Sequence, residues 1–366
     1  MKKRLAVALV FLAMLCGVSA MAGNAKLPAT ARKVVLDPID TGGFRWKVVD
    51  APVPKPSDQQ VIVRVHAVSL NNGELSRLKP SSDPGRAGRV PASDAAGEVV
   101  AIGKLVKDVS IGDRVVGMYF SDWADGPYKR SMLEGSHGWQ ADGLLADYIA
   151  LDTKAVAPIP EGWTYEQAAT LPTAGLTAWN AVARHGGVRA GDVVLVQGTG
   201  GVSTFALQFA VASGARVIVT SSSDDKLQRA KGLGAEAGIN YKREPVWSER
   251  VVQLTNGHGA DLVVDIGGKS TLEESTKSLA DEGKLAIVGG LSGYDGNISS
   301  WGLLERSAQA YGVFVGSRAE YLQMSQFMTK HQLRPVIERV YPFAQYPEAL
   351  ELLASGNFVG KIVLRM

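Results

Sequence analysis

The stretch Val193-Val194-Leu195-Val196-Gln197-Gly198-Thr199-Gly200-Gly201-Val202-Ser203 decides the fold of this chain. An apolar run typical of a buried strand leads into clustered glycines, and a second apolar run, residues 205–212, follows. The glycines let the backbone turn tightly and approach a pyrophosphate, whose charge the free N–H groups of a following helix stabilise. Strand, glycine turn and helix in this order favour a dinucleotide-binding unit over a purely structural turn. Ser203 replaces the third glycine of the usual fingerprint.

The pattern around this stretch alternates between strands and helices. Predicted strands at 193–197, 216–220, 262–265 and 284–288 enclose predicted helices at 202–213, 224–233 and 271–280. Such βαβ alternation is typical of a doubly wound parallel sheet of the α/β class, which we place at residues 165–318.

The flanking parts of the chain have a different rhythm. Residues 32–164 contain short strands closed by glycines, at 60–68, 97–103 and 112–117, which predicts a small β-barrel unit. Residues 319–366 hold a helix, a short strand near 339–341, a helix at 346–354 and a last strand at 361–364. Because this tail does not extend the βαβ series, we expect it to return and complete the first unit.

The loop at residues 119–143 interrupts the barrel pattern. It holds Tyr119, Phe120, Trp123, Tyr128 and Trp139 among glycines, aspartates and serines. A long loop of this kind is either an excursion over the surface or a lid over a substrate, and the sequence leaves both open.

The end of the second strand of the parallel sheet determines which dinucleotide binds. An NAD site usually carries Asp or Glu about 20 residues after the first glycine, where it bonds the ribose hydroxyls. Here residues 220–223 read Thr-Ser-Ser-Ser, and Lys226 lies just beyond. Hydroxyls and an ammonium can bind a 2′-phosphate, whereas we expect Asp224 and Asp225 to occupy the cap of the next helix. The sequence therefore predicts NADPH as the cofactor.

Composition limits the other functions. The formal net charge is +3, and without Lys2, Lys3 and Arg4 the basic residues fall from 39 to 36 and equal the 36 acidic ones. The body of the protein therefore gives no reason to expect a nucleic-acid partner. A single cysteine, Cys16, excludes a disulfide framework and a thiolate metal cage.

Residues 1–22 have the three parts of a secretion signal. A basic start precedes the apolar residues 5–18, and small residues at 18–22 suit a signal peptidase. The apolar run is shorter than the ~20 residues of a membrane span, so we expect no stable span. We expect a periplasmic or secreted protein; the alternative is translation from Met21 and a cytoplasmic location. Reduced nicotinamide cofactors are cytoplasmic, and the sequence does not resolve this conflict with export.

From about residue 32 to its C-terminus, the chain resembles the medium-chain dehydrogenase/reductase superfamily, and within it the zinc-free quinone oxidoreductases and enoyl reductases. The blocks that carry the resemblance, in chain order, are Ser69-Leu70-Asn71-Asn72, Gly97-Glu98-Val99-Val100, Gly112-Asp113-Arg114-Val115, residues 171–178, residues 198–203, Gly238-Ile239-Asn240-Tyr241, Phe314-Val315-Gly316-Ser317 and Gly360-Lys361-Ile362-Val363. The resemblance implies a Rossmann domain inserted in a GroES-like β-barrel catalytic domain. It also implies NADPH in the cleft between the two, and a homodimer paired through the Rossmann sheet edge.

The resemblance further implies which residues surround the cofactor. They are Thr177, Val315, Gly316 and Ser317 at the nicotinamide; Gly198, Gly200, Gly201, Val202 and Ser203 at the pyrophosphate; Ser221, Ser222, Ser223, Lys226 and Tyr241 at the 2′-phosphate; and Gly267, Gly289, Gly290 and Leu291 at later strand ends.

Zinc-dependent members of the superfamily differ from this chain at their ligand positions. They carry Gly-His-Glu where this chain has Ala92-Ser93-Asp94, and their first cysteine ligand would fall near Asn71. The five histidines, His66, His137, His185, His258 and His331, show no ligand spacing. We therefore expect no metal site and no alcohol oxidation through a zinc alkoxide.

The remaining chemistry is hydride transfer from the nicotinamide to an electrophilic carbon. The protein would supply orientation and a polar contact for the developing oxyanion. A quinone or an α,β-unsaturated ketone fits, and Asn71 is the candidate donor by family position, although a strand-end Asn serving a turn is an equal alternative. The alternatives for the whole chain are an NADP-linked alcohol dehydrogenase or aldehyde reductase, and a non-catalytic NADPH-binding sensor or structural protein.

Overall fold

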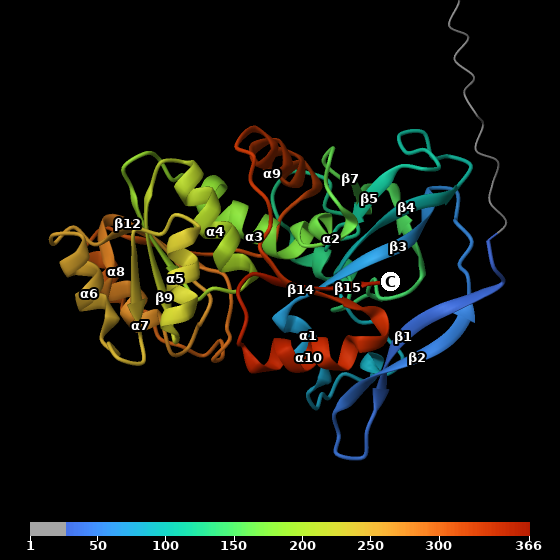
Figure 1. Ribbon diagram of the computed structural model, residues 1–366, viewed down its shortest axis with the longest axis horizontal. Coiled ribbons are helices and arrows are strands. Elements are labelled where there is room, and N and C mark those ends of the chain that lie inside the picture. Colours follow the sequence, from blue (N-terminus) through green and yellow to red (C-terminus); the bar gives the residue numbers. More distant parts are fainter. Residues whose placement is uncertain (1–26) are drawn as a thin grey trace, which may run out of the picture.

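The computed structural model describes residues 27–366. The signal predicted at residues 1–22, the alternative start at Met21 and the single cysteine lie outside the described residues. Figure 1 shows two units side by side, one built on a parallel sheet (yellow to orange) and one rich in antiparallel strands (blue, teal and red).

The parallel sheet has six strands in the order β10-β9-β8-β11-β12-β13, and each neighbouring pair runs parallel. The strands are β8 (Val193–Gln197), β9 (Arg216–Ser221), β10 (Ala237–Asn240), β11 (Ala260–Asp265), β12 (Leu279–Ile287) and β13 (Gln309–Gly312). Every residue of β8 is buried, which explains its uninterrupted apolar run. The chain order reverses between β8 and β11, and ligands of such sheets bind beyond the carboxyl ends of the strands at this switch point.

Helices cover the sheet, as Figure 1 shows, and the predicted doubly wound α/β fold is confirmed. They are α4 (Gly201–Ala212), α5 (Asp224–Gly232), α6 (Trp247–Leu254), α7 (Leu272–Lys277) and α8 (Ser300–Leu304), and the short α3 (Leu176–Trp179) packs against α4. Among residues 27–366, β13 pairs only with β12, so it is an edge strand there. The homodimer expected at this edge stays a prediction.

One predicted helix was wrong in length. We expected a helix over 271–280, but α7 ends at Lys277 and β12 begins at Leu279. Leu279 pairs with Ala260 of β11, the register then shifts, and Glu282 takes a φ of 57° at the irregularity. Strand pairing has therefore overridden the helical spacing of these residues.

The second unit is built on a seven-stranded sheet. Its order is β14-β15-β3-β4-β5-β7, and β6 also pairs with β3. The strands are β3 (Gln60–Leu70), β4 (Asp94–Ile102), β5 (Arg114–Gly117), β6 (Tyr148–Asp152), β7 (Val156–Pro158), β14 (Ile337–Pro342) and β15 (Lys361–Arg365). A separate antiparallel ribbon joins β1 (Thr30–Pro38) to β2 (Phe44–Pro52). Short helices α1 (Asn72–Leu78) and α2 (Tyr165–Ala168) follow β3 and β7.

The C-terminal segment returns to this second sheet. After α9 (Arg318–Lys330) come β14, α10 (Tyr346–Ser355) and β15. β15 runs antiparallel to β3, with Ile362 opposite Leu70, so the C-terminal segment completes the sheet of the β-rich unit (Figure 1). This pairing brings Lys361, at the start of β15, next to the residues that follow β3.

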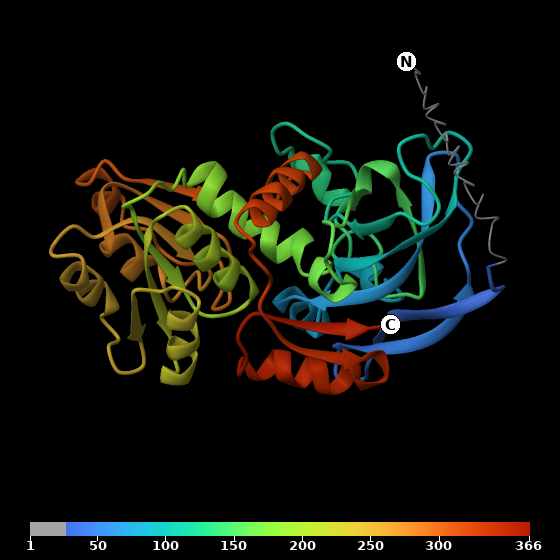
Figure 2. The ribbon, with the colours of Figure 1, turned by 45° about the horizontal axis from the view of Figure 1, so that its top comes forward.

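One hydrophobic core runs through both units. It includes Val116 and Phe120 of the β-rich unit, Leu171, Phe205 of α4 and Met324 of α9. Figure 2 shows α9 beside α3 and α4, between the two units. Among residues 27–366 we find no helix with the length and apolar character that crossing a bilayer requires.

Candidate active site

The start of α4 is open toward the carboxyl edge of the parallel sheet. Gly200 occupies the N-cap position, and no side chain caps the helix. A Cβ atom placed on Gly200 would meet nothing within 4 Å, so there is space directly over the loop. Uncapped N–H groups at a helix start bind anions well. The residues present therefore fit the pyrophosphate of a dinucleotide.

Ser203 faces away from this opening. Its side chain is 1% exposed, and its hydroxyl donates to the carbonyl of Gln197 at 2.7 Å. The serine thus ties the first turn of α4 to the end of β8, which explains how the loop tolerates it in place of glycine.

The end of β9 carries hydroxyls but no carboxylate. Ser221 is its last residue, and Ser223 is the N-cap of α5, where its hydroxyl accepts from the backbone N–H of Lys226. Our placement of Asp224 and Asp225 at the cap was therefore wrong: both lie in the first turn. A carboxylate there still favours the helix through its dipole.

The charged groups around this strand end favour an anion. Asp224 is bound by Arg243, with distances of 2.6 and 2.7 Å, and by Asn240 at 2.9 Å, so its charge is offset. The ammonium of Lys226 donates to the carbonyl of Gly356, and burial followed by the charge of Lys242 lowers the pKa of Lys226. The structure therefore brings Lys242, which sequence reasoning missed, close to Lys226. Tyr241 is 42% exposed beside them.

Three of the four residues predicted at the nicotinamide, Val315, Gly316 and Ser317, lie beyond the end of β13, and the fourth, Thr177, lies on α3. Val315 has a φ of 56°, which is rare for a β-branched residue, and its carbonyl accepts from the Asn180 amide at 2.6 Å. A Cβ on Gly316 would lie 2.1 Å from that same amide nitrogen, so only glycine fits. The Ser317 hydroxyl caps α9 in a capping box with Glu320. Strained backbone held this firmly is typical of functional sites.

The later strand ends form tight turns around a buried carboxylate. Asp265, the last residue of β11, accepts from Gln197, Thr271 and Ser275 side chains and from the backbone N–H of Gly268. Gly267 follows this turn, and Gly289 and Gly290 follow β12. Leu291 is 58% exposed next to them.

A network of hydrogen-bonded side chains, the polar cluster, lies on the other side of the phosphate loop. It consists of Asn71, Ser93, Asp94, Thr173 and Lys361. Asn71 donates to Ser93 at 3.2 Å and to Asp94 at 2.9 Å, Thr173 donates to Asp94 at 2.6 Å, and Lys361 donates to Asn71 at 2.5 Å. The ammonium of Lys361 lies 3.8 Å from Asp94.

The polar cluster touches the phosphate loop. Lys361 also donates to the Leu70 carbonyl at 2.6 Å, and a Cβ on Gly201 would lie 2.4 Å from the Lys361 Cδ. The backbone N–H of Gly360 donates to the Thr199 carbonyl at 2.9 Å. Gly201 therefore leaves room for the Lys361 side chain to pass into the cluster.

Burial controls the ionisation of this cluster. Asp94 is 0% and Lys361 3% exposed, and burial raises the pKa of Asp94 and lowers the pKa of Lys361. Glu74 of α1, 3% exposed, accepts from the Ala92 N–H at 3.2 Å. Burial, and then the charge of Asp94, raises the pKa of Glu74 to about 7.

Asn71 does not serve the adjoining turn with its side chain. It is the N-cap residue of α1, yet its amide makes no capping hydrogen bond and points to Ser93 and Asp94 instead. Sequence reasoning missed Glu74, Thr173, Lys361 and Asn180 as parts of the site. A lysine that begins the apolar strand β15 was the one available signal.

The aromatic loop at 119–143 packs inward. Tyr119, Phe120 and Trp123 are at most 9% exposed. The ring centroid of Phe120 lies 5.7 Å from that of Phe314, the residue before Val315. The backbone N–H of Arg318 donates to the Trp123 carbonyl at 3.0 Å. These three aromatic side chains thus pack near the turn that leads into α9, whereas residues 124–131 of the same loop are exposed.

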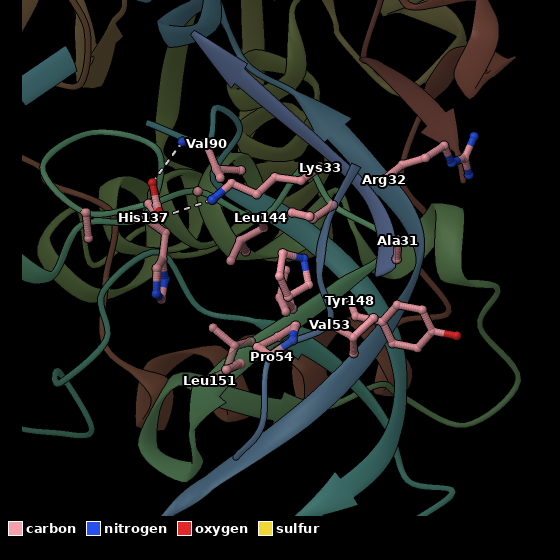
Figure 3. Close-up of a pocket in the computed structure, with 18 residues that line it drawn as sticks. Ala31, Arg32, Lys33, Val53, Pro54, Val90, His137, Leu144, Tyr148 and Leu151 are labelled. Atoms are coloured by element: carbon pink, nitrogen blue, oxygen red, sulfur yellow. Dashed lines mark hydrogen bonds and ion pairs between the residues drawn. The ribbon is translucent and has the colours of Figure 1, made fainter. Parts of the chain in front are cut away.

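A cavity of about 460 Å³ lies elsewhere, within the β-rich unit (Figure 3). Residues 31–33, 51–54 and 137–151 contribute to its lining, and Lys33 there lies 4.0 Å from Asp142. The histidines are scattered: His137, for example, contacts the Met118 carbonyl at 2.8 Å, and His258 contacts Asp261 at 3.0 Å. In the described part of the chain no three His, Cys, Asp or Glu residues are grouped as a metal site.

Comparison with known proteins agrees with this architecture. Residues 57–161 match the alcohol dehydrogenase GroES-like domain and residues 201–330 match the zinc-binding dehydrogenase family. A zinc-type alcohol dehydrogenase-like protein of Schizosaccharomyces pombe is 38% identical over 343 residues, which cover 92% of this chain and 99% of the relative.

Two solved structures extend the comparison. A putative alcohol dehydrogenase from Sinorhizobium meliloti is 37% identical with a TM-score of 0.85, covering 93% of this chain and 100% of that one. The quinone oxidoreductase from Coxiella burnetii is 27% identical with a TM-score of 0.74, covering 92% and 99%. The family expected from the sequence is thus confirmed: the chain belongs to the medium-chain dehydrogenase/reductase superfamily of NAD(P)H-dependent oxidoreductases.

Proposed function

We propose that this protein uses NADPH to reduce quinones, enones or similar conjugated carbonyl compounds, without zinc. The observation that carries the proposal is the polar cluster next to the phosphate loop. Its half-buried Thr173 hydroxyl, held against Asp94, can orient and stabilise an oxyanion, and the Asn71 amide and the Lys361 ammonium hold Asp94 in place behind it.

The donor set of the polar cluster does not fit zinc. Zinc sites in proteins use thiolates, imidazoles and carboxylates. Here Asp94 is the only such group in the cluster, and the ammonium of Lys361 lies 3.8 Å from it. A divalent cation would have to displace that ammonium from a buried position, so we derive no step through a metal.

The cofactor side would be held by the groups described above. NADPH supplies a hydride when bound. The uncapped start of α4 would bind its pyrophosphate, and Lys226 with Lys242 would attract the 2′-phosphate at the end of β9, which carries hydroxyls rather than a carboxylate. Asn180 fixes the backbone of Val315 and Gly316 where the nicotinamide is expected.

The polar cluster would act on the acceptor. Asn71 stays the predicted contact of the acceptor oxygen, although both of its amide hydrogens are directed to Ser93 and Asp94 in this structure. Quinones and enones need only a hydride and a stabilised oxyanion. Simple aldehydes and ketones need a stronger electrophile, which this cluster does not offer.

A panel of acceptors tests the proposal. The absorbance of NADPH should fall with small quinones and enones, and NADP-linked oxidation of primary alcohols should be slow or absent. Brisk oxidation of ethanol or benzyl alcohol alongside inert quinones and enones would replace the reaction by the alternative that the alcohol dehydrogenase relatives favour. If NADPH is oxidised with none of the acceptors in the panel, a non-catalytic NADPH-binding protein would be favoured.

A further inference from the structure

Thr173 is the most accessible hydroxyl of the polar cluster. It is half-buried, whereas Ser93 is 6% exposed. It lies one turn before Thr177, whose hydroxyl donates to the Thr173 carbonyl at 2.6 Å. The neighbouring Ala174 lies under the phosphate loop, 3.3 Å from the position of a Cβ on Gly201. Thr173 therefore stands between the expected nicotinamide position and Asp94.

The carboxyl group of Asp94 is hydrogen-bonded to this hydroxyl. Asp94 Oδ1 accepts from Thr173 at 2.6 Å, while Asp94 Oδ2 accepts from Asn71 at 2.9 Å. Asp94 is fully buried and shares its surroundings with the carboxyl of Glu74. Two buried carboxyls close together resist double ionisation, so one of them tends to hold a proton.

The other charged and titratable groups here come from three elements. Lys361 comes from β15, Arg77 from α1 and Tyr119 from the loop after β5. Arg77 donates to the Trp139 carbonyl rather than to either carboxyl. Burial raises the pKa of Tyr119 and thus keeps its phenol neutral. Lys361 is therefore the cation that directly stabilises Asp94 once Asp94 loses a proton.

We propose that Thr173 delivers the proton that the conjugated carbonyl acceptor takes up, and that Asp94 replaces it. The assignment rests on the proposed function, because it needs an acceptor reduced by hydride.

The acceptor gains a hydride, that is one proton and two electrons, from NADPH, which leaves an oxyanion on the conjugated oxygen and NADP⁺. The Thr173 hydroxyl, which donates to Asp94 in the structure, turns toward the oxyanion. Its O–H bond breaks as the oxyanion takes the proton, and Thr173 Oγ1 takes the proton of the Asp94 carboxyl. The remaining Asp94 carboxylate is paired with the Lys361 ammonium and the Asn71 amide. A solvent proton then restores the acid.

Three threonine variants test the assignment by steady-state kinetics with NADPH and an enone. Thr173→Val should lower kcat by about 100- to 10,000-fold, as loss of a general acid does, with KM and NADPH affinity little changed. Thr173→Ser should restore most of the rate. Thr170→Val is the matched control, since Thr170 is fully buried and donates only to the Gln167 carbonyl; it should keep the wild-type rate.

The pH profile distinguishes a proton donor from a structural threonine. The wild-type kcat should fall as the pH rises through the pKa of the buried carboxyls, because the acid must be protonated. Thr173→Val should be slow without this decline. The double variant Thr173→Val/Asp94→Asn should be no slower than Thr173→Val alone, since both act in one relay.

A measurement on the cofactor-free protein completes the test. Carbon NMR of labelled wild-type carboxyls should show that Asp94 is protonated at mildly acidic pH; an ionised Asp94 at that pH would overturn the proposal even if the variants fail to fold. Wild-type kcat in Thr173→Val would overturn it and leave the proposed function intact. A wild-type protein that binds NADPH but turns over no acceptor would overturn both.

Discussion

On one side of the phosphate loop, polar groups point into open space; on the other side, they are bonded to one another. The N–H groups at the start of α4 have no side-chain cap, and nothing lies within 4 Å of a Cβ placed on Gly200. In the polar cluster, each of the five side chains has a partner within the chain. The open side leaves space for a ligand, whereas the closed side keeps its geometry without one. Changes in the cluster should therefore alter stability and chemistry, and changes at the loop should alter binding.

The largest expected effect comes from removing the cation of the cluster. Lys361→Met leaves the buried Asp94 without its ammonium and the Asn71 carbonyl oxygen without a donor. We expect a loss of about 3–5 kcal/mol in the free energy of unfolding, measured by urea denaturation. The exposed Lys330→Met on α9 is the control and should change stability by about 0.5 kcal/mol or less. Equal stabilities for the two variants would mean that the cluster is not the stabilising network described here.

The next effect is a pH dependence of stability. The pKa of Glu74 rises from 4.5 to about 7 on folding, so the folded chain binds a proton that the unfolded chain releases between these values. This contribution is fully present below about pH 4.5 and is lost as the pH rises to about 7. The stability difference between wild type and Glu74→Gln should thus shift by about 1–3 kcal/mol against the wild type over that range. Thermal unfolding at several pH values measures it, with the exposed Glu348→Gln as the control. A constant difference would mean that Glu74 is ionised throughout.

At the open side, the start of α4, we expect a substitution to alter cofactor binding rather than stability. Gly200→Ala places a methyl group where the structure has space, so stability should change by about 1 kcal/mol or less. The same methyl would lie where a pyrophosphate approaches, and NADPH affinity should fall by about 10- to 100-fold, measured by calorimetry. Unchanged affinity would place the cofactor elsewhere.

The sequence predicts the phosphate loop better than it predicts the polar cluster. The phosphate loop is a local motif: strand, glycines and helix lie within 20 residues, and each has its own signature. The polar cluster joins Asn71 to Lys361, which are 290 positions apart, and only the pairing of β15 with β3 brings them together. No residue spacing in the sequence predicts a contact between positions so far apart. The family resemblance indicated Asn71 but not its partners.

Local patterns also failed where tertiary pairing was stronger. The helical spacing at 271–280 yielded to strand pairing at Leu279. Ser223, rather than Asp224 or Asp225, caps α5, because all three residue types are good caps and only the backbone geometry distinguishes them. Lys242 lies near Lys226 because the end of β10 lies close to the start of α5, where Asn240 donates to Asp224, and the charge of Lys242 lowers the pKa of Lys226.

Calorimetric titration of the purified protein with NADPH and with NADH tests directly whether the protein selects NADPH. NADPH should bind more tightly, and Lys226→Ala should weaken NADPH by about 1–3 kcal/mol while leaving NADH unchanged, as expected for one lost charge-assisted bond. Lys231→Ala, an exposed lysine in the last turn of the same helix, should bind both cofactors as the wild type does. Equal dissociation constants for NADPH and NADH in the wild type would mean that the end of β9 does not bind the 2′-phosphate.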